Sequence, residues 1–91
     1  MYFLLSYDYV ENAVEQRAPF RDAHLKLARK ASARGELVLA GAFAEPVDGA
    51  ALVFRAEDRS VVERFVAADP YVKGGVVSDW RIRPWTVVIG G

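Results

Sequence analysis

The sequence predicts an α+β fold in which the elements follow the order βαββαβ. Four short apolar segments have the length and composition of strands: 2–9, 37–43, 50–54 and 76–85. Two further segments, 19–34 and 58–68, repeat apolar residues at helical spacing and lie between these strands. This order is typical of the ferredoxin-like arrangement, in which two helices cover one face of a four-stranded antiparallel sheet.

The first half of the chain contains one strand and the first long helix. Asn12 and Glu15 are spaced to cap a short helical turn after the strand. Pro19 disfavours helical conformation in the residue before it, so the main helix is predicted to start near Pro19 and to stop at Gly35. The inner face of this helix carries five residues at helical spacing: Phe20, His24, Leu27, Ala28 and Ala31.

The middle of the chain contains a hairpin and the second helix. Asp48-Gly49 is a turn dipeptide, and it is expected to join the second and third strands. The second helix starts at Asp58 or Ser60, because Ser60 and Glu63 have the spacing of a capping box. Asp69-Pro70 ends this helix and starts a tight turn.

The last strand has an alternating pattern that predicts one buried face. Trp80 and Ile82 fall on one face, and the residues of the other face are Asp79, Arg81, Arg83 and Trp85. Pro84 cannot donate to a sheet ladder and favours an edge or a break. The apolar tail 86–89 is therefore expected to pack on a partner subunit or to extend the sheet.

Length and composition predict a single small domain, residues 1–91, that forms a homodimer. A chain of this length buries only about 60–65% of its unfolded surface, and it has no cysteine that could form a disulfide. Its composition is nevertheless 53% hydrophobic with a formal net charge of zero. A four-stranded sheet covered on one side leaves an apolar face bare. Pairing of two such faces in a homodimer would bury it.

The same composition argues against several kinds of partner. A balanced charge disfavours nucleic acid, and no apolar run approaches the roughly 20 residues of a membrane span. One histidine and no cysteine, without ligand spacing, predict no metal site. No dinucleotide or flavin fingerprint is present, so no cofactor is expected. A cytoplasmic location is the expectation, since the N-terminus has no signal-peptide features.

Four sequence blocks resemble the YciI-like (YCII-related) family, with consistent spacing over nearly the whole chain. The blocks are Arg21-Asp22-Ala23-His24-Leu25, the segment 35–41, the segment 69–75 that begins Asp-Pro-Tyr, and the segment 80–85. The resemblance implies a dimeric α+β barrel, related in fold to muconolactone isomerase. It also implies an active site built around a histidine and an aspartate, which correspond here to His24 and Asp69. One branch of the family comprises chloromuconolactone dehalogenases.

His24 has two interpretations. As a general acid–base it would accept and return protons near neutral pH, and a carboxylate on one ring nitrogen would orient it and stabilise the imidazolium. Alternatively, it is a structural histidine on an apolar helix face, satisfied by hydrogen bonds. Asp69 has a similar alternative, because an aspartate before proline commonly caps a helix N-terminus. The two roles of Asp69 are compatible, since a carboxylate has two oxygens.

Three further residues are candidates for substrate binding. Ser6 and Tyr71 each carry a hydroxyl that could donate to a substrate oxygen. Arg21, with Arg17 one turn earlier, could hold an anionic substrate, because guanidinium forks suit carboxylates. The alternatives are structural hydroxyls and a solvated helix face.

The resulting hypothesis is a small cofactor-independent enzyme. His24 would move a proton and Asp69 would orient it, in an isomerase, lyase or dehalogenase type of reaction on a small organic molecule. The alternative is a non-catalytic dimer that binds a small ligand or serves as an accessory module.

Overall fold

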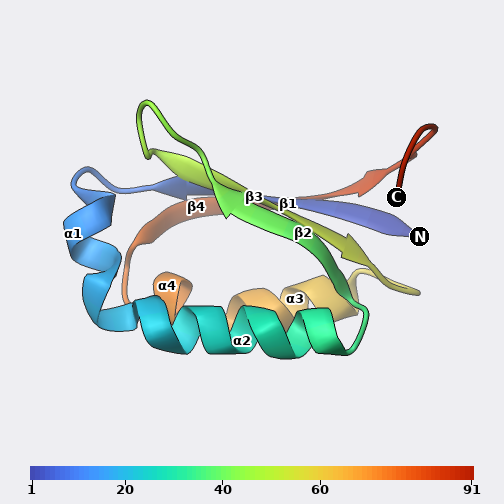
Figure 1. The fold of residues 1–91 in the computed structure, drawn as a ribbon, viewed down its shortest axis with the longest axis horizontal. Coiled ribbons are helices and arrows are strands. Elements are labelled where there is room, and N and C mark those ends of the chain that lie inside the picture. Colours follow the sequence, from blue (N-terminus) through green and yellow to red (C-terminus); the bar gives the residue numbers. More distant parts are fainter.

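The computed structural model describes all 91 residues, and it confirms the βαββαβ order (Figure 1). The elements are β1 (Tyr2–Tyr9), α1 (Ala13–Arg17), the 3₁₀ helix η1 (Ala18–Phe20), α2 (Arg21–Ala33), β2 (Leu37–Ala42), β3 (Gly49–Arg55), α3 (Ser60–Ala68), α4 (Pro70–Lys73) and β4 (Val77–Trp85).

The four strands form one antiparallel sheet in the order β2-β3-β1-β4, which is the ferredoxin-like arrangement. Figure 1 shows α2, α3 and α4 below the same face of this sheet, while the opposite face carries no helix. At the centre of the sheet Leu5 lies opposite Leu52 on β3 and Ile82 on β4. None of the helices is both long enough and apolar enough to cross a bilayer.

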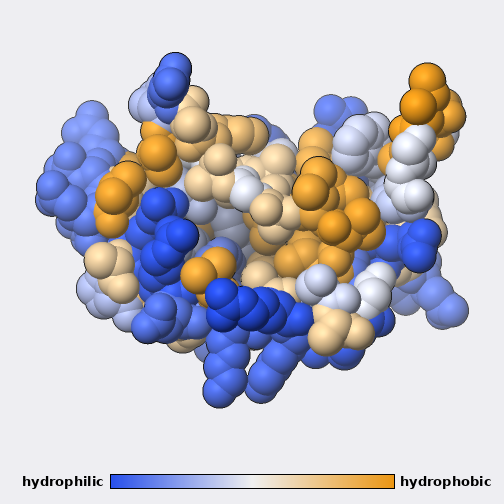
Figure 2. All heavy atoms as spheres, viewed as in Figure 1, coloured by the Kyte–Doolittle hydropathy of each residue, from blue (hydrophilic) through white to orange (hydrophobic).

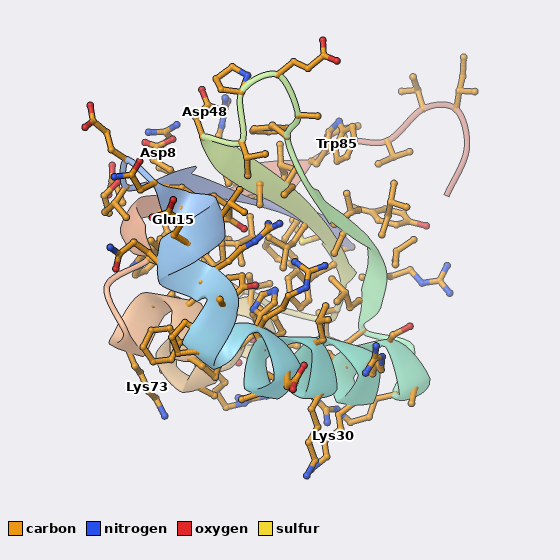
Figure 3. The ribbon with its side chains drawn as sticks, turned by 60° about the vertical axis from the view of Figure 1, so that its left-hand side comes forward. Asp8, Glu15, Lys30, Asp48, Lys73 and Trp85 are labelled. Carbon is orange, nitrogen blue, oxygen red and sulfur yellow. The ribbon has the colours of Figure 1, made fainter.

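The core lies between the sheet and the helices. Alternate residues of β1 and β3 point into it, because successive side chains of a strand face opposite sides. The buried set comprises Phe3, Leu5 and Tyr7 from β1, Leu52 and Phe54 from β3, and Val62, Phe65 and Val66 from α3. Outside this layer, Lys30 and Lys73 point away from the sheet (Figure 3). The two layers therefore bring one face of each helix against one face of the sheet.

The helix ends differ in detail from the sequence predictions. The first helical region is broken into α1, η1 and α2, so the long helix begins at Arg21 and not at Pro19, which lies in η1. Asn12 precedes α1 in a left-handed conformation and makes no side-chain cap. Ser60 is the first residue of α3 and not its N-cap, so the predicted capping box of Ser60 and Glu63 does not form. Instead, Asp58 accepts the Ser60 N–H at 2.8 Å. Gly35 has a φ of +79° and ends the helical region as expected.

The uncovered face of the sheet carries apolar side chains among charged ones. Leu39 and Trp85 lie on this face and are 70% and 46% exposed. The predicted alternation of β4 is confirmed only around Ile82, which is buried while Arg81 and Arg83 are exposed on the other side. Trp80, predicted on the buried face, is 39% exposed. The tail after Trp85 does not extend the sheet, which corrects one of the two roles expected for it.

Candidate active site

Three segments that are distant in the chain meet between the sheet and α2. Tyr7 comes from the core face of β1, His24 from the second turn of α2, and Asp69 from the junction of α3 and α4. His24 Nδ1 lies 2.7 Å from Asp69 Oδ1, and the Tyr7 hydroxyl donates to Asp69 Oδ2 at 2.7 Å. The structure therefore brings together the histidine and the aspartate that the family resemblance paired.

Asp69 is the centre of this cluster. Its side chain has no exposed surface, and a buried carboxylate is stable only when its oxygens are hydrogen-bonded. Oδ1 also accepts the backbone N–H of Tyr71 at 3.0 Å, so Asp69 is the N-cap of α4, with Pro70 at the first helical position. Asp69 thus caps a helix and holds His24 at the same time.

The hydrogen bond from Asp69 decides which nitrogen of His24 is available for chemistry. A carboxylate accepts, so the neutral imidazole carries its proton on Nδ1 and leaves a lone pair on Nε2. Nε2 has no hydrogen-bond partner within the protein, and the side chain is 13% exposed. Nε2 is therefore a proton acceptor that a molecule beside His24 could reach.

Aromatic rings fix the plane of the imidazole. The ring of Tyr71 is stacked on His24 with a centroid distance of 3.8 Å and an angle of 6° between the planes. Tyr9 meets Tyr71 edge-on at 6.2 Å. Together with the Asp69 hydrogen bond, this stack leaves the imidazole a single orientation.

A second contact holds the two chain segments that carry the site. Phe20, which directly precedes α2, packs against Gly74 at the end of α4. A Cβ at Gly74 would lie 2.5 Å from the Phe20 ring, so only glycine permits this approach. The N-terminal end of α2 is therefore packed directly on the turn that follows Asp69.

His24 lines a cleft of about 360 Å³ between α2 and strands β1, β2 and β3. In the space-filling view the surface between α2 and β2 is hollowed, with strongly hydrophilic atoms at one side and weakly apolar atoms over β2 (Figure 2). The lining residues are Tyr7, Tyr9, Arg17, Arg21, His24, Leu25, Ala28, Ala40, Gly41, Ala42, Ala50, Leu52 and Tyr71. This volume is at the small end of the range for ligand sites.

The predicted substrate-binding residues divide into two groups. Arg21 and Tyr71 line the cleft beside His24. Ser6 does not, because it follows the opposite parity to Tyr7 along β1 and points to the uncovered face of the sheet. Ser6 therefore lies outside the cleft that contains His24.

Tyr7 is the residue that the sequence analysis missed. Its position on β1 has the same parity as Phe3 and Leu5, so the alternation places it in the core. A buried tyrosine hydroxyl requires a hydrogen-bond partner, and this requirement is the sequence signal that could have marked Tyr7 as a site residue. The partner, Asp69, could not be identified because it lies 62 residues away in the chain.

The tyrosines around the cleft hold their protons strongly. Burial raises the pKa of Tyr7 far above its ordinary value of 10.0, and the charge of Asp69 and the hydrogen bond to it raise it further. Burial also raises the pKa of Tyr9 to about 12 and that of Tyr71 in the same direction, while the charges of Arg17 and Arg21 oppose both shifts. All three hydroxyls are therefore donors at neutral pH.

These shifts predict a loss of stability at alkaline pH. Above pH 10 the unfolded chain releases tyrosine protons that the folded chain retains, so the free energy of unfolding falls as pH rises. The fall is about 1.4 kcal/mol per pH unit for the buried Tyr7, and it is smaller for Tyr9 because solvent screens its partly exposed hydroxyl. Urea unfolding between pH 8 and pH 11.5 measures it. Tyr9→Phe should reduce the slope, and equal stability at pH 8 and pH 11 would contradict the expectation.

A second cleft, of about 250 Å³, lies at the other end of α2. Its walls include Leu27, Phe54 and Phe65, and two of its three charged residues, Arg34 and Glu36, already pair at 2.9 Å. It contains none of the predicted site residues. Nowhere in the chain are three or more His, Asp or Glu side chains grouped so that they could bind a metal ion.

Comparisons with known proteins agree with the fold and the family. An uncharacterized protein of Haemophilus influenzae is 26% identical over 97 aligned positions, which cover 97% of this chain and 99% of that protein. The solved 5-chloro-2-hydroxyhydroquinone dehydrochlorinase (TftG) of Burkholderia phenoliruptrix, in complex with 2,5-dihydroxybenzoquinone, superposes with a TM-score of 0.81. The superposition covers 94% of each chain at 22% sequence identity. Residues 1–86 match the YCII-related domain, and the chain therefore belongs to the YCII-related family.

Proposed function

We propose that this protein is a small acid–base enzyme in which His24 transfers a proton to and from a substrate in the cleft. One observation carries the proposal. The fully buried carboxylate of Asp69 holds Nδ1 of His24, while the His24 side chain lines an open cleft of about 360 Å³. This is the arrangement that a general base requires, since the tautomer is fixed and the acceptor nitrogen is left free.

The reaction class follows from the groups that line the cleft. Nε2 would take a proton from a C–H or O–H acid, and the Asp69 carboxylate would stabilise the imidazolium that results. The electrons of a broken C–H bond would form a new double bond. The imidazolium would then return its proton to another atom, which is isomerisation, or a leaving group would depart, which is elimination. Asp69 acts here as a positioning residue, because it contacts His24 and not the cleft.

The comparisons support this class of reaction without identifying a substrate. The dehydrochlorinase with the same fold acts on a chlorinated hydroxyhydroquinone, and removal of HCl is an elimination. The protonated hydroxyls of Tyr9 and Tyr71 suit a substrate with oxygen substituents, because each can donate to an oxygen that gains charge during the reaction, whereas Tyr7 already donates to Asp69.

The test is proton exchange in D₂O. The wild-type protein is mixed with a panel of small C–H acids that includes 5-chloro-2-hydroxyhydroquinone and unsaturated lactones, and loss of substrate C–H signals is followed by ¹H NMR. Chloride release is measured in parallel for the chlorinated compound. We expect exchange or turnover faster than with an equal concentration of free imidazole. Binding of several panel members without exchange of any would favour the alternative, a non-catalytic ligand-binding module.

A further inference from the structure

Two arginines in the cleft beside His24 have no counter-ion. Arg17, at the end of α1, and Arg21, at the start of α2, both line the cleft. Neither forms an ion pair, whereas Arg34, Arg59 and Arg81 each lie within 4.0 Å of a carboxylate. Two like charges that line one cleft repel each other, so an anion bound between them would relieve that repulsion.

The cleft contains no acidic residue that could balance them. Its lining has three groups that can carry positive charge, Arg17, Arg21 and His24, and no aspartate or glutamate. Asp69, the carboxylate that holds His24, is fully buried and does not line the cleft, and its oxygens are occupied by three donors. A ligand is thus the remaining source of negative charge inside the cleft.

The remaining walls determine what the rest of such a ligand would contact. The cleft is also lined by apolar residues of the strands and of α2, most of them small: Ala28, Ala40, Gly41, Ala42, Ala50 and Leu52. These residues offer no donor or acceptor from their side chains, so they suit a flat apolar body. The charged and the apolar parts of the cleft therefore match a molecule with one anionic end.

We infer that the cleft binds a small organic carboxylate, with the carboxylate held by Arg17 and Arg21 and the apolar body against the small residues of β2 and β3. Guanidinium groups bind carboxylates through paired, charge-assisted hydrogen bonds, which makes this anion the best match. The charges of both arginines lower the pKa of Tyr9 and of Tyr71, which agrees with all four residues lining the same cleft. The inference names the substrate class of the proposed enzyme and rests on the same site.

Binding of benzoate tests the inference, with benzamide as its neutral counterpart of the same shape. ¹⁵N-labelled protein is titrated with each compound, and the shifts of His24, Ala28 and Gly41 give the dissociation constants. We expect saturable binding of benzoate and at least tenfold weaker binding of benzamide. Arg17→Gln and Arg21→Gln should each weaken benzoate binding by roughly tenfold, the loss typical of one charge-assisted contact.

A matched control separates the cleft from general charge effects. Arg29→Gln removes the same charge from the exposed side of α2, outside the cleft, and should leave benzoate binding unchanged. The inference is overturned if benzamide binds as tightly as benzoate, if benzoate does not bind, or if all three variants bind it equally. If benzoate binds but no panel compound exchanges protons, the carboxylate site is supported and the proposed enzymatic activity is contradicted. Failure of the inference and failure of the proposed function are therefore distinguishable.

Discussion

His24→Gln is expected to slow proton exchange by about 10²- to 10⁴-fold, the range that general acid–base catalysis contributes. Glutamine keeps an N–H that can donate to Asp69, so the buried carboxylate retains a partner. It cannot accept and return a proton near neutral pH, which removes the chemistry and not the packing. The rate of C–H loss in D₂O, measured on whichever panel compound the wild-type protein exchanges, gives the effect.

The control for this variant is Lys26→Gln, which lies on the same helix and is exposed outside the cleft. It should exchange at the wild-type rate. Circular dichroism and urea unfolding should show that both variants are folded. A His24→Gln protein that is folded and retains a rate within a few-fold of wild type would contradict the assignment of His24 as the base.

Asp69→Ala is expected to reduce the free energy of unfolding by about 3–5 kcal/mol, because three hydrogen bonds to a buried carboxylate are lost at once. The substitution leaves three buried donors without an acceptor: the Tyr7 hydroxyl, His24 Nδ1 and the Tyr71 N–H. Small domains have a total stability of only about 5–15 kcal/mol, so this single change removes a large part of it. Urea unfolding at a fixed protein concentration measures the loss.

Asp58→Ala is a matched control, because Asp58 also accepts a backbone N–H at the start of a helix. Asp58 is exposed, and it caps α3 without a buried partner. Its removal should therefore cost much less than that of Asp69. Equal losses would mean that Asp69 stabilises the fold only as a helix cap, without a contribution from His24 and Tyr7.

Most of the fold follows from periodicity along the sequence. The short apolar run of β1, the alternating residues of β4, the apolar stripe on α2 and the glycine at its end are local patterns, and each predicts its element. The limits of the helices were less certain, because Pro19 is accommodated in a 3₁₀ turn between two helices. Pairing of the uncovered sheet faces in a homodimer stays a prediction.

The site was less accessible than the fold, because its members are brought together by tertiary contacts. His24 and Asp69 are 45 residues apart, and their pairing came from the family resemblance and not from any spacing. The hydroxyl of Ser6 suggests a role in substrate binding, but the alternation of side chains along β1 places Ser6 on the opposite face of the sheet from Tyr7. Tyr7 itself is a core position by pattern and a site residue only through its contact with Asp69.

The separation of these contacts along the chain also makes His24 a reporter of folding. Its imidazole is the only one in the protein, and its environment requires that the C-terminal third of the chain has docked onto the N-terminal third. Such long-range contacts form late, since closing a loop of this length costs entropy before any contact stabilises it. In a refolding experiment the native signal of this one ring should therefore appear only when the whole topology is complete.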